Sequence, residues 1–162
     1  MIRKAVFEDL ESINKIYNQA VKHKYQTADT SPISIEKRKI WYLNHDTEKY
    51  PVFVFQKGNQ IIGWVSLSAY REGRKALETV AEVSYFVHRD FQGKGVGNLL
   101  LGAAISKSKE YGFKNLIAIL LQPNTRSIKL LERFNFERWG CMPKIAIIDG
   151  KEHDHLFYGF RL

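Results

Sequence analysis

The segment HRDFQGKGVGNLLL, residues 88–101, places three glycines and a lysine between an apolar run and a leucine-rich segment. The apolar run predicts a β-strand and the leucine-rich segment predicts a helix. Glycine lets backbone N–H groups approach a ligand closely, and the first turn of a helix has N–H donors without partners. The segment therefore predicts a strand–loop–helix unit that binds an anion.

The rest of the chain predicts a mixed α/β fold in which helices pack on a central sheet. We expect Asp9 and Ser34 to cap the first two helices. The 162 residues show no internal repeat, and 44% are hydrophobic, so one domain spanning 1–162 is expected. The expected helices are 9–23, 35–45, 95–111 and 124–134, and the expected strands are 1–6, 52–56, 61–70, 78–87, 115–121, 137–142 and 153–162.

The net charge of +8 suits an anionic partner, but the basic residues are scattered and form no long block. A disordered nucleic-acid-binding arm is therefore not expected. The single cysteine, Cys141, excludes an internal disulfide, and no apolar run approaches the roughly 20 residues of a membrane span. With no sign of a secretion signal, we expect a cytoplasmic protein without nucleic-acid or membrane partners.

Two common phosphate-binding signatures do not fit the glycine loop. A P-loop requires Ser or Thr directly after its Gly-Lys pair, and here Gly95 follows Lys94. A dinucleotide-binding fingerprint requires a third glycine at its sixth position, which here is Asn98 or Leu100 depending on the starting glycine. Both nucleotide readings are therefore rejected.

The stretch from Gln92 to Gly97 resembles the pyrophosphate-binding pattern of the GNAT acetyltransferase superfamily, together with the flanking strand and helix, the strand NLIAILL and the later Asn124. The resemblance implies a GNAT fold with a mostly antiparallel, twisted sheet, acetyl-CoA as co-substrate and no metal. It also implies coenzyme contacts from the strand and loop residues Phe86, Val87, Gln92, Gly93, Lys94, Gly95, Val96, Gly97 and Asn98, and from Asn124 and Ser127.

Glu82 is a carboxylate within the apolar strand TVAEVSYFV. Alternation places it on one face with Ser84 and Phe86, while Val83 and Tyr85 lie on the other face. An unpaired buried carboxylate is costly. Glu82 is therefore either a general base with a raised pKa, open to a cleft, or a partner in a structural ion pair, for example with Arg74 or Lys144.

The combination of TADTSP, AEVSYFVHRDFQGKGVG and WGCMPKIAIIDGKEHDH resembles the phosphinothricin and methionine-sulfoximine acetyltransferase branch over nearly the whole chain. This resemblance implies that Glu82 is the base, directly or through water, and that Arg74 holds the substrate carboxylate. It places Asp29, otherwise a simple turn residue, and Ser84 at the acceptor pocket, and it suggests a homodimer.

Two positions depart from that branch. Leu131 stands seven residues after Asn124, where many relatives have tyrosine and some have histidine as the acid for the leaving thiolate. Glu152 replaces a tryptophan found shortly before the final aspartate in some relatives. No thiolate acid is therefore assigned, and the acceptor is not fixed.

The sequence favours an acetyl-CoA-dependent N-acetyltransferase that acetylates a small amino acid or analogue by direct transfer. Another amine, such as a polyamine, an antibiotic or a protein N-terminus, is the alternative. A third interpretation, a basic module that binds nucleic acid, is not favoured, because the chain lacks aromatic and basic residues interleaved on one strand face as a stacking platform. We expect Cys141 to be a small strand residue, His153 and His155 to lie in a solvent-facing turn without metal, and Trp41 to line the core or a cleft.

Overall fold

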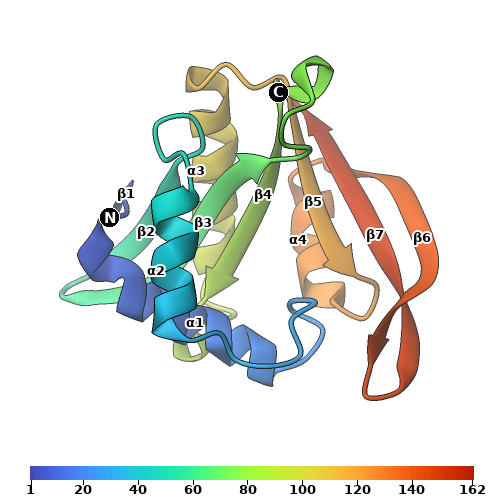
Figure 1. Cartoon of the computed structure of the whole chain (residues 1–162), viewed down its shortest axis with the longest axis horizontal. Coiled ribbons are helices and arrows are strands. Elements are labelled where there is room, and N and C mark those ends of the chain that lie inside the picture. Colours follow the sequence, from blue (N-terminus) through green and yellow to red (C-terminus); the bar gives the residue numbers. More distant parts are fainter.

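The computed structural model describes residues 1–162 and contains one seven-stranded sheet with helices on both faces (Figure 1). The strand order is β1-β2-β3-β4-β5-β7-β6, and only β4 and β5 are parallel neighbours. The predicted mixed α/β fold with a mostly antiparallel sheet is confirmed. The strands are β1 (Ile2–Lys4), β2 (Val52–Lys57), β3 (Gln60–Ala69), β4 (Val80–Val87), β5 (Asn115–Leu121), β6 (Glu137–Ile148) and β7 (Lys151–Arg161).

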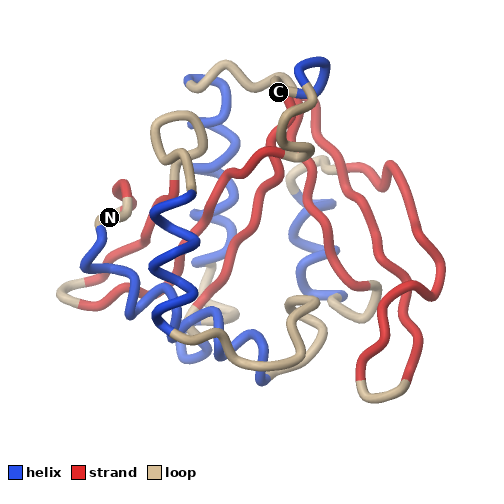
Figure 2. The backbone as a smooth tube through the Cα atoms, in the orientation of Figure 1, coloured by secondary structure: helices blue, strands red, loops and turns tan.

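The helices lie in two layers around the sheet (Figure 2). Helices α1 (Leu10–Lys22) and α2 (Ile35–Asn44) cover one face, and α3 (Val96–Glu110) and α4 (Thr125–Arg133) cover the other. Short 3₁₀ turns occupy Phe7–Asp9, Lys75–Leu77 and Arg89–Phe91. None of the helices has the length and apolar character that crossing a membrane requires.

Each helical layer encloses its own hydrophobic cluster. The larger cluster joins the sheet to α3 and α4 through residues such as Val83, Leu100 and Leu131. The smaller one packs Leu10 and Ile13 of α1 against β2 and β3. β4 contributes Val83 to the larger cluster, and its alternate residues face the side of the sheet that α1 and α2 cover.

The predicted helix caps have different outcomes. Ser34 caps α2, because its hydroxyl accepts a hydrogen bond from the Lys37 N–H at 3.3 Å. The prediction for Asp9 is wrong: its carboxylate accepts from the Arg3 guanidinium at 2.6 and 2.9 Å and from the Val6 N–H. Asp9 thus ties β1 to the start of α1 instead of capping the helix.

The C-terminal hairpin is longer than the sequence suggested. β6 continues past Pro143 to Ile148, and β7 begins at Lys151. Asp149 and Gly150 form the connection with φ of 51° and 74°, the left-handed conformations of a tight two-residue hairpin turn. Pro143 is tolerated because β6 is the edge strand of the sheet.

β4 and β5 part after a short parallel contact. Their register covers only Val80–Glu82 against Asn115–Ile117, whereas β4 stays paired with β3 as far as Val87. The C-terminal half of β4 therefore has a strand neighbour on one side only. The two strands diverge visibly, and the connection between α1 and α2 runs below the open end (Figure 1).

Candidate functional site

Two cavities lie on opposite faces of β4 where it separates from β5. The first, of about 510 Å³, is bounded by the glycine loop and α4, and we term it the α4 cavity. The second, of about 540 Å³, is bounded by α2 and the loop before it, and we term it the α2 pocket. Phe86 and Gln26 line both, so the two spaces adjoin.

The α4 cavity gathers most of the predicted coenzyme-binding residues. It does not include Lys94, which is exposed with its Nζ 5.5 Å from the Phe91 ring centre, or Val96, which is buried in the core. The cavity brings together β4, the glycine loop and α4, which are far apart in the sequence. The predicted residues that line the cavity are Phe86, Val87, Gln92, Gly93, Gly95, Gly97, Asn98, Asn124 and Ser127.

The glycine loop adopts a conformation that favours glycine. Gly93 and Gly95 have φ of 75° and 82°, and a Cβ at either position would meet no atom within 4 Å. Their requirement is therefore conformational rather than steric. Gly95 is the residue before α3, whose first-turn N–H groups have no acceptor within the helix, as an anion site at a helix N-terminus requires.

Helix α4 directs three basic side chains toward the same cavity. Arg126 donates from Nη1 to Gln92 Oε1 at 2.8 Å, Arg133 donates to Asn98 Oδ1 at 3.4 Å, and Lys129 lies between them. None of the three forms an ion pair. This group was not predicted from the sequence, although the spacing of 126, 129 and 133 places it on one helix face. The cavity suits a polyanionic ligand.

Hydrogen-bond donors and acceptors also line the wall beside the cationic residues. Asn124 Oδ1 accepts from the Ser127 N–H at 3.3 Å and so caps α4, which leaves the Asn124 amide NH₂ free. The hydroxyl of Tyr85 is buried and makes no hydrogen bond of ordinary geometry, although the Ser127 side chain lies near it. Burial raises the pKa of Tyr85 to about 12, and the nearby Ser127 opposes that rise. Gln92 Nε2 donates to the Val87 carbonyl at 3.2 Å on β4.

The α2 pocket has a polar floor and aromatic walls. Glu82, Ser84 and Phe86 project into it from β4, as the alternation predicted. The predicted residue Asp29 also lines it, and the Tyr17 hydroxyl donates to Asp29 Oδ2 at 2.5 Å. The other linings are Tyr25, Gln26, Thr27, Ala28, Ile33, Lys37, Arg38, Trp41, Trp64, Ser66, Ser68, Ile119, Leu120, Leu121 and His155.

Glu82 has no hydrogen-bond or ion-pair partner in the chain. Burial raises the pKa of its carboxyl above the ordinary value of 4.5. The proposed ion pairs with Arg74 or Lys144 are not formed. Of the two alternatives from the sequence, the structure therefore matches the carboxyl group open to a cleft.

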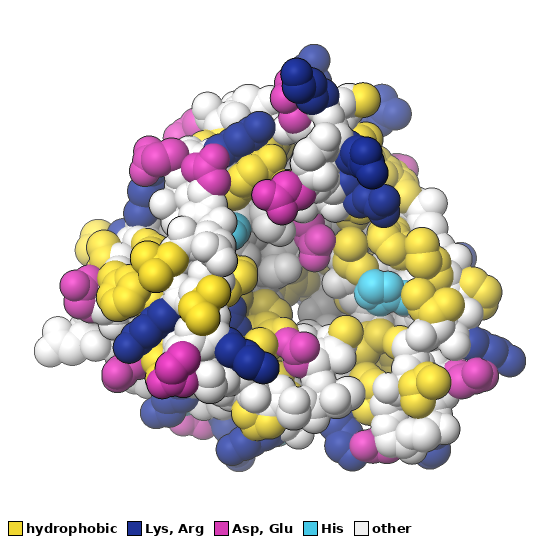
Figure 3. All heavy atoms as spheres, in the orientation of Figure 1, with side chains coloured by type: hydrophobic (Ala, Val, Ile, Leu, Met, Phe, Trp, Pro, Cys, Tyr) yellow, Lys and Arg dark blue, Asp and Glu magenta, His cyan; other side chains and the backbone are white.

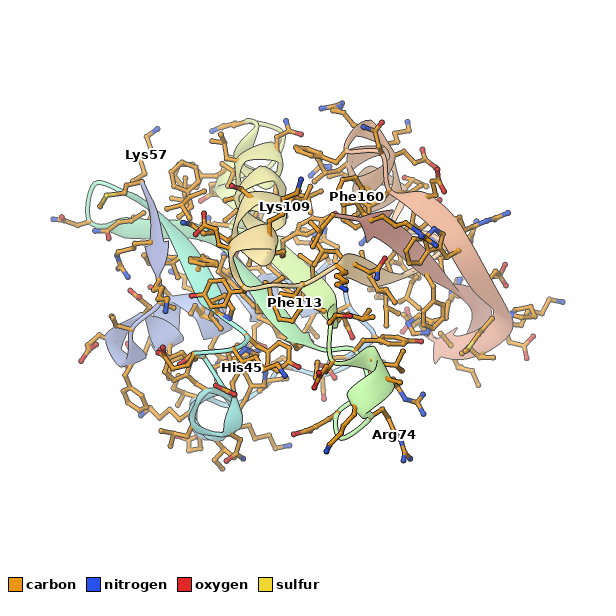
Figure 4. The ribbon with its side chains drawn as sticks, turned by 90° about the horizontal axis from the view of Figure 1, so that it is seen from above. His45, Lys57, Arg74, Lys109, Phe113 and Phe160 are labelled. Atoms are coloured by element: carbon orange, nitrogen blue, oxygen red, sulfur yellow. The ribbon has the colours of Figure 1, made fainter.

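The predicted carboxylate-binding residue Arg74 is not brought to either cavity. It is exposed and lies before the 3₁₀ turn at Lys75–Leu77, pointing away from the body of the protein (Figure 4). A different arginine occupies the α2 pocket. Arg38 is 4% exposed, and its guanidinium carbon lies 4.6, 4.8 and 5.6 Å from the ring centres of Tyr17, Trp41 and Trp64.

Three residues that the sequence analysis set aside have defined places. His155 is on β7 and not in a solvent-facing turn; it lines the α2 pocket, and burial lowers the pKa of its imidazole. His153, also on β7, packs edge-on against Tyr25. Cys141 is exposed on β6 outside both cavities, and partial desolvation with the Asp154 carboxylate raises the pKa of its thiol. No group of three or more possible metal ligands is present.

From the outside, the face that carries α1 and α2 is hollowed at its centre (Figure 3). Hydrophobic surface lines the hollow, and basic and acidic side chains stand around its rim. A pocket with aromatic walls and a few converging polar groups is typical of a small-molecule site.

Comparison with known proteins now decides the family. Residues 10–136 match the Acetyltransferase (GNAT) family. The chain belongs to this family. It is an N-acetyltransferase, and the fold and family expected from the glycine loop are confirmed.

This acetyltransferase is similar over its whole length to proteins with named substrates. It is 36% identical to a Bacillus subtilis protein provisionally named a phosphinothricin acetyltransferase, covering 99% of this chain and 98% of the relative. It is 31% identical to the L-methionine sulfoximine/L-methionine sulfone acetyltransferase of Pseudomonas aeruginosa, covering 99% and 94%.

A solved structure provides the matching comparison in three dimensions. The phosphinothricin acetyltransferase of Sinorhizobium meliloti, in complex with acetyl-CoA, superposes with a TM-score of 0.93 at 28% identity. The match covers 100% of this chain and 88% of that one. The overall fold is therefore shared with a phosphinothricin acetyltransferase solved in complex with acetyl-CoA.

Proposed function

We propose that this enzyme transfers the acetyl group of acetyl-CoA to the amino group of a small amino acid or analogue. Methionine sulfoximine, methionine sulfone and phosphinothricin are the acceptors that the names of its relatives suggest. The transfer is direct, within a ternary complex. The observation that carries the proposal is the meeting of the α4 cavity and the α2 pocket at Phe86.

The α4 cavity supports the choice of donor. Coenzyme A carries a pyrophosphate and a further phosphate, which match the unpaired N–H groups at the start of α3 and the cations of α4. In this assignment Arg126, Lys129 and Arg133 hold phosphates, and the open edge of β4 beside Val87 receives the pantetheine arm. Acetyl-CoA then supplies an activated thioester at the junction of the two cavities.

The α2 pocket supports the acceptor and the base. An ammonium group must lose a proton before it attacks a thioester, and Glu82 is the carboxylate available for it. Glu82 takes that proton directly or through water, the nitrogen attacks the carbonyl carbon, and the C–S bond breaks to release the thiolate. The nitrogen loses a second proton as the amide forms, and this proton passes through solvent to the thiolate. Positioning two substrates side by side supplies much of the acceleration without a protein nucleophile.

We also propose that the enzyme is a cytoplasmic homodimer. The edge strand β6 supports an association surface, because Trp139, Met142, Ile145 and Ile147 expose between 45% and 65% of their surface. Apolar side chains gathered on an exposed edge strand favour pairing with another chain. Light scattering coupled to size-exclusion chromatography measures the mass in solution and tests the dimer.

The proposed reaction is tested by thiol release from acetyl-CoA with a panel of amino acids, polyamines and aminoglycosides. We expect release with methionine sulfone or phosphinothricin, and intersecting initial-velocity lines when both substrates are varied. Mass spectrometry after mixing with acetyl-CoA alone should show an unmodified chain. Parallel initial-velocity lines together with an acetylated protein would reject direct transfer and indicate a two-step route through an acetyl-enzyme. Turnover of polyamines alone would reject amino acids as the acceptor class.

A further inference from the structure

Arg38 is a buried cation without a counterion in the chain. Its Nε donates to Asn14 Oδ1 at 3.4 Å, and neither terminal nitrogen has a hydrogen-bond partner. Nη2 is fully shielded from solvent. Buried charges in proteins are normally paired and hydrogen-bonded, so an unpaired guanidinium at a pocket wall needs a partner from elsewhere.

The groups around Arg38 do not supply that partner. Tyr17, Trp41 and Trp64 hold the guanidinium between aromatic rings, which orient a cation but do not accept its in-plane N–H bonds. Asp29 is the nearby acid, yet it forms no ion pair with Arg38, and its carboxylate accepts the Tyr17 hydroxyl instead. The aromatic rings therefore fix the position of the guanidinium, while the N–H groups of its two terminal nitrogens have no acceptor.

We propose that Arg38 binds an anionic oxygen group of the acceptor. This inference rests on the proposed function and specifies its substrate class, because it makes the acceptor an anionic amine. A planar guanidinium matches a carboxylate or phosphinate through two parallel N–H···O bonds. Arg38 thus takes the role that the sequence had assigned to Arg74, which lies outside the pocket.

The strand register orients the acceptor between Arg38 and the base. Trp64, against which Arg38 stacks, lies opposite Phe86 across β3 and β4, whereas Glu82 lies opposite Ser68. Arg38 and Glu82 therefore stand toward two ends of one pocket. An acceptor with its acidic group at Arg38 therefore lies beside Phe86, where the α2 pocket adjoins the α4 cavity, in the same pocket that Glu82 lines.

Arg38 also disfavours the alternative acceptors. A polyamine or aminoglycoside carries several positive charges, and burying one of them beside an unpaired guanidinium is unfavourable. Lys37 lines the same pocket and adds a second cation. Glu82 and Asp29 line the pocket as anions, so the repulsion of a polycation is local to the end that Arg38 occupies.

The test compares Arg38→Gln with the parent enzyme on three acceptors that differ in their anionic groups. Phosphinothricin has a carboxylate and a phosphinate, methionine sulfone has only the carboxylate, and methionine sulfone amide has neither. We expect kcat/KM for methionine sulfone to fall by about 100-fold, as for loss of a buried charged partner, with the amide nearly unaffected. Lys39→Gln removes a charge from the same helix outside the pocket and should leave all three acceptors unchanged.

The pattern across acceptors also identifies which anion is bound. A loss for both acidic acceptors assigns the α-carboxylate to Arg38, and a loss confined to phosphinothricin assigns the distal phosphinate. Equal losses for all three acceptors, or none, would overturn the inference. Because those comparisons need an active parent enzyme, a binding measurement separates the two proposals: the deaminated carboxylic acid of methionine sulfone, titrated calorimetrically with coenzyme A present, should bind the parent and not Arg38→Gln.

Failure of the parent to acetylate any amino acid would reject the proposed function. The calorimetric titration would then still test whether Arg38 binds a carboxylate. Equal binding of the deaminated acid to both proteins would reject the role of Arg38 even if acetylation were observed. Arg38→Lys provides a further readout, because it keeps the charge and loses the fork. We expect it to recover only part of the binding.

Discussion

The carboxyl group of Glu82 and the hydroxyl of Tyr85 project from opposite faces of β4, and neither has a hydrogen-bond partner in the chain. Glu82 lines the α2 pocket and Tyr85 lines the α4 cavity. Burying a polar group without a hydrogen-bond partner is costly, and this holds for both the carboxyl and the hydroxyl. One strand therefore presents one unsatisfied group to each proposed substrate, and both groups can be tested separately.

Glu82→Gln should slow acetyl transfer by about 100-fold or more at neutral pH, the range found for loss of a general base. The deficit should shrink at high pH, where the amine loses its proton unaided. In the parent, burial raises the pKa of Glu82, so the acid limb of kcat/KM should lie above pH 4.5. A pH–rate series measures both effects, with Glu78→Gln, exposed and outside both cavities, as the matched control. A pH-independent effect would remove Glu82 from proton transfer.

The same substitution should change stability in a pH-dependent direction. Because its pKa is raised on folding, the contribution of Glu82 is fully present below pH 4.5 and is lost as pH rises through the folded pKa. Glu82→Gln should therefore be more stable than the parent at pH 8, with the difference shrinking toward pH 4. Urea denaturation at both pH values measures this difference. A variant that is less stable at pH 8 would indicate an unrecognised partner for the carboxylate.

Tyr85→Phe should stabilise the free enzyme and weaken its hold on the coenzyme. Removing a buried hydroxyl without a partner should raise the free energy of unfolding by about 1 kcal/mol. If the same hydroxyl contacts bound coenzyme A, the dissociation constant for acetyl-CoA should rise about tenfold, the equivalent of about 1.4 kcal/mol. Thermal unfolding and calorimetric titration measure the two effects.

Tyr42→Phe is the matched control for Tyr85→Phe. The Tyr42 hydroxyl donates to the Ala5 carbonyl at 3.0 Å and lines neither cavity. Its removal should lower stability and leave acetyl-CoA binding unchanged. If Tyr85→Phe behaves in the same way, the Tyr85 hydroxyl is bonded within the folded chain and has no role toward the coenzyme.

Neutralising the cations of α4 should weaken acetyl-CoA without altering the acceptor. We expect Arg126→Gln or Arg133→Gln to raise KM for acetyl-CoA about tenfold, because hydrogen bonds to charged groups contribute about 1.5–3 kcal/mol. The effect should diminish at high salt, which screens partly exposed charges. Steady-state kinetics at two ionic strengths checks this, and Lys109→Ala, at the far end of α3, serves as the control. An equal rise with Lys109→Ala would indicate a general charge effect.

Gly63→Ala should loosen the attachment of α3 to the sheet. A Cβ at Gly63 would lie 2.8 Å from Leu100 Cδ1, 3.1 Å from the Phe86 carbonyl oxygen and 3.2 Å from Val96 Cγ1. Overpacking of this kind costs about 1–3 kcal/mol, and chemical denaturation should record it. Gly140→Ala, whose Cβ would meet nothing closer than 3.7 Å, should have a much smaller effect. Equal stability of the two variants would mean that α3 shifts to accommodate the methyl group.

The sequence predicted the features that depend on local order. Alternation placed Glu82 and Ser84 on one face of β4, and the glycine spacing marked the start of α3. The turn at Asp149 and Gly150 was not predicted, although Asp-Gly between apolar runs is a strong hairpin signal, because the expected strand ended at Met142, before Pro143. Local sequence patterns are therefore enough to predict the secondary-structure elements and the face of the sheet to which each strand side chain points.

Local rules do not reach residues whose role depends on tertiary neighbours. Arg38 is one of several basic residues on a polar helix, and only the packing of α2 over Trp64 makes it a buried cation. Alternation placed Tyr85 on the face of the strand away from Glu82, but only the packing around it buries its hydroxyl without a hydrogen bond of ordinary geometry. Arg74 is the converse case, because its assignment came from resemblance and its position depends on a loop whose path the sequence does not encode locally.

The separation of β4 from β5 has a consequence for how such enzymes diversify. The two cavities adjoin at Phe86 and Gln26, whereas the other side chains that line each cavity stand on different surfaces of the sheet. Under the proposed function, substitutions in α2 should change which amine is accepted while the source of the acetyl group stays the same. A lineage can acquire new acceptors by altering one surface and inheriting the other intact.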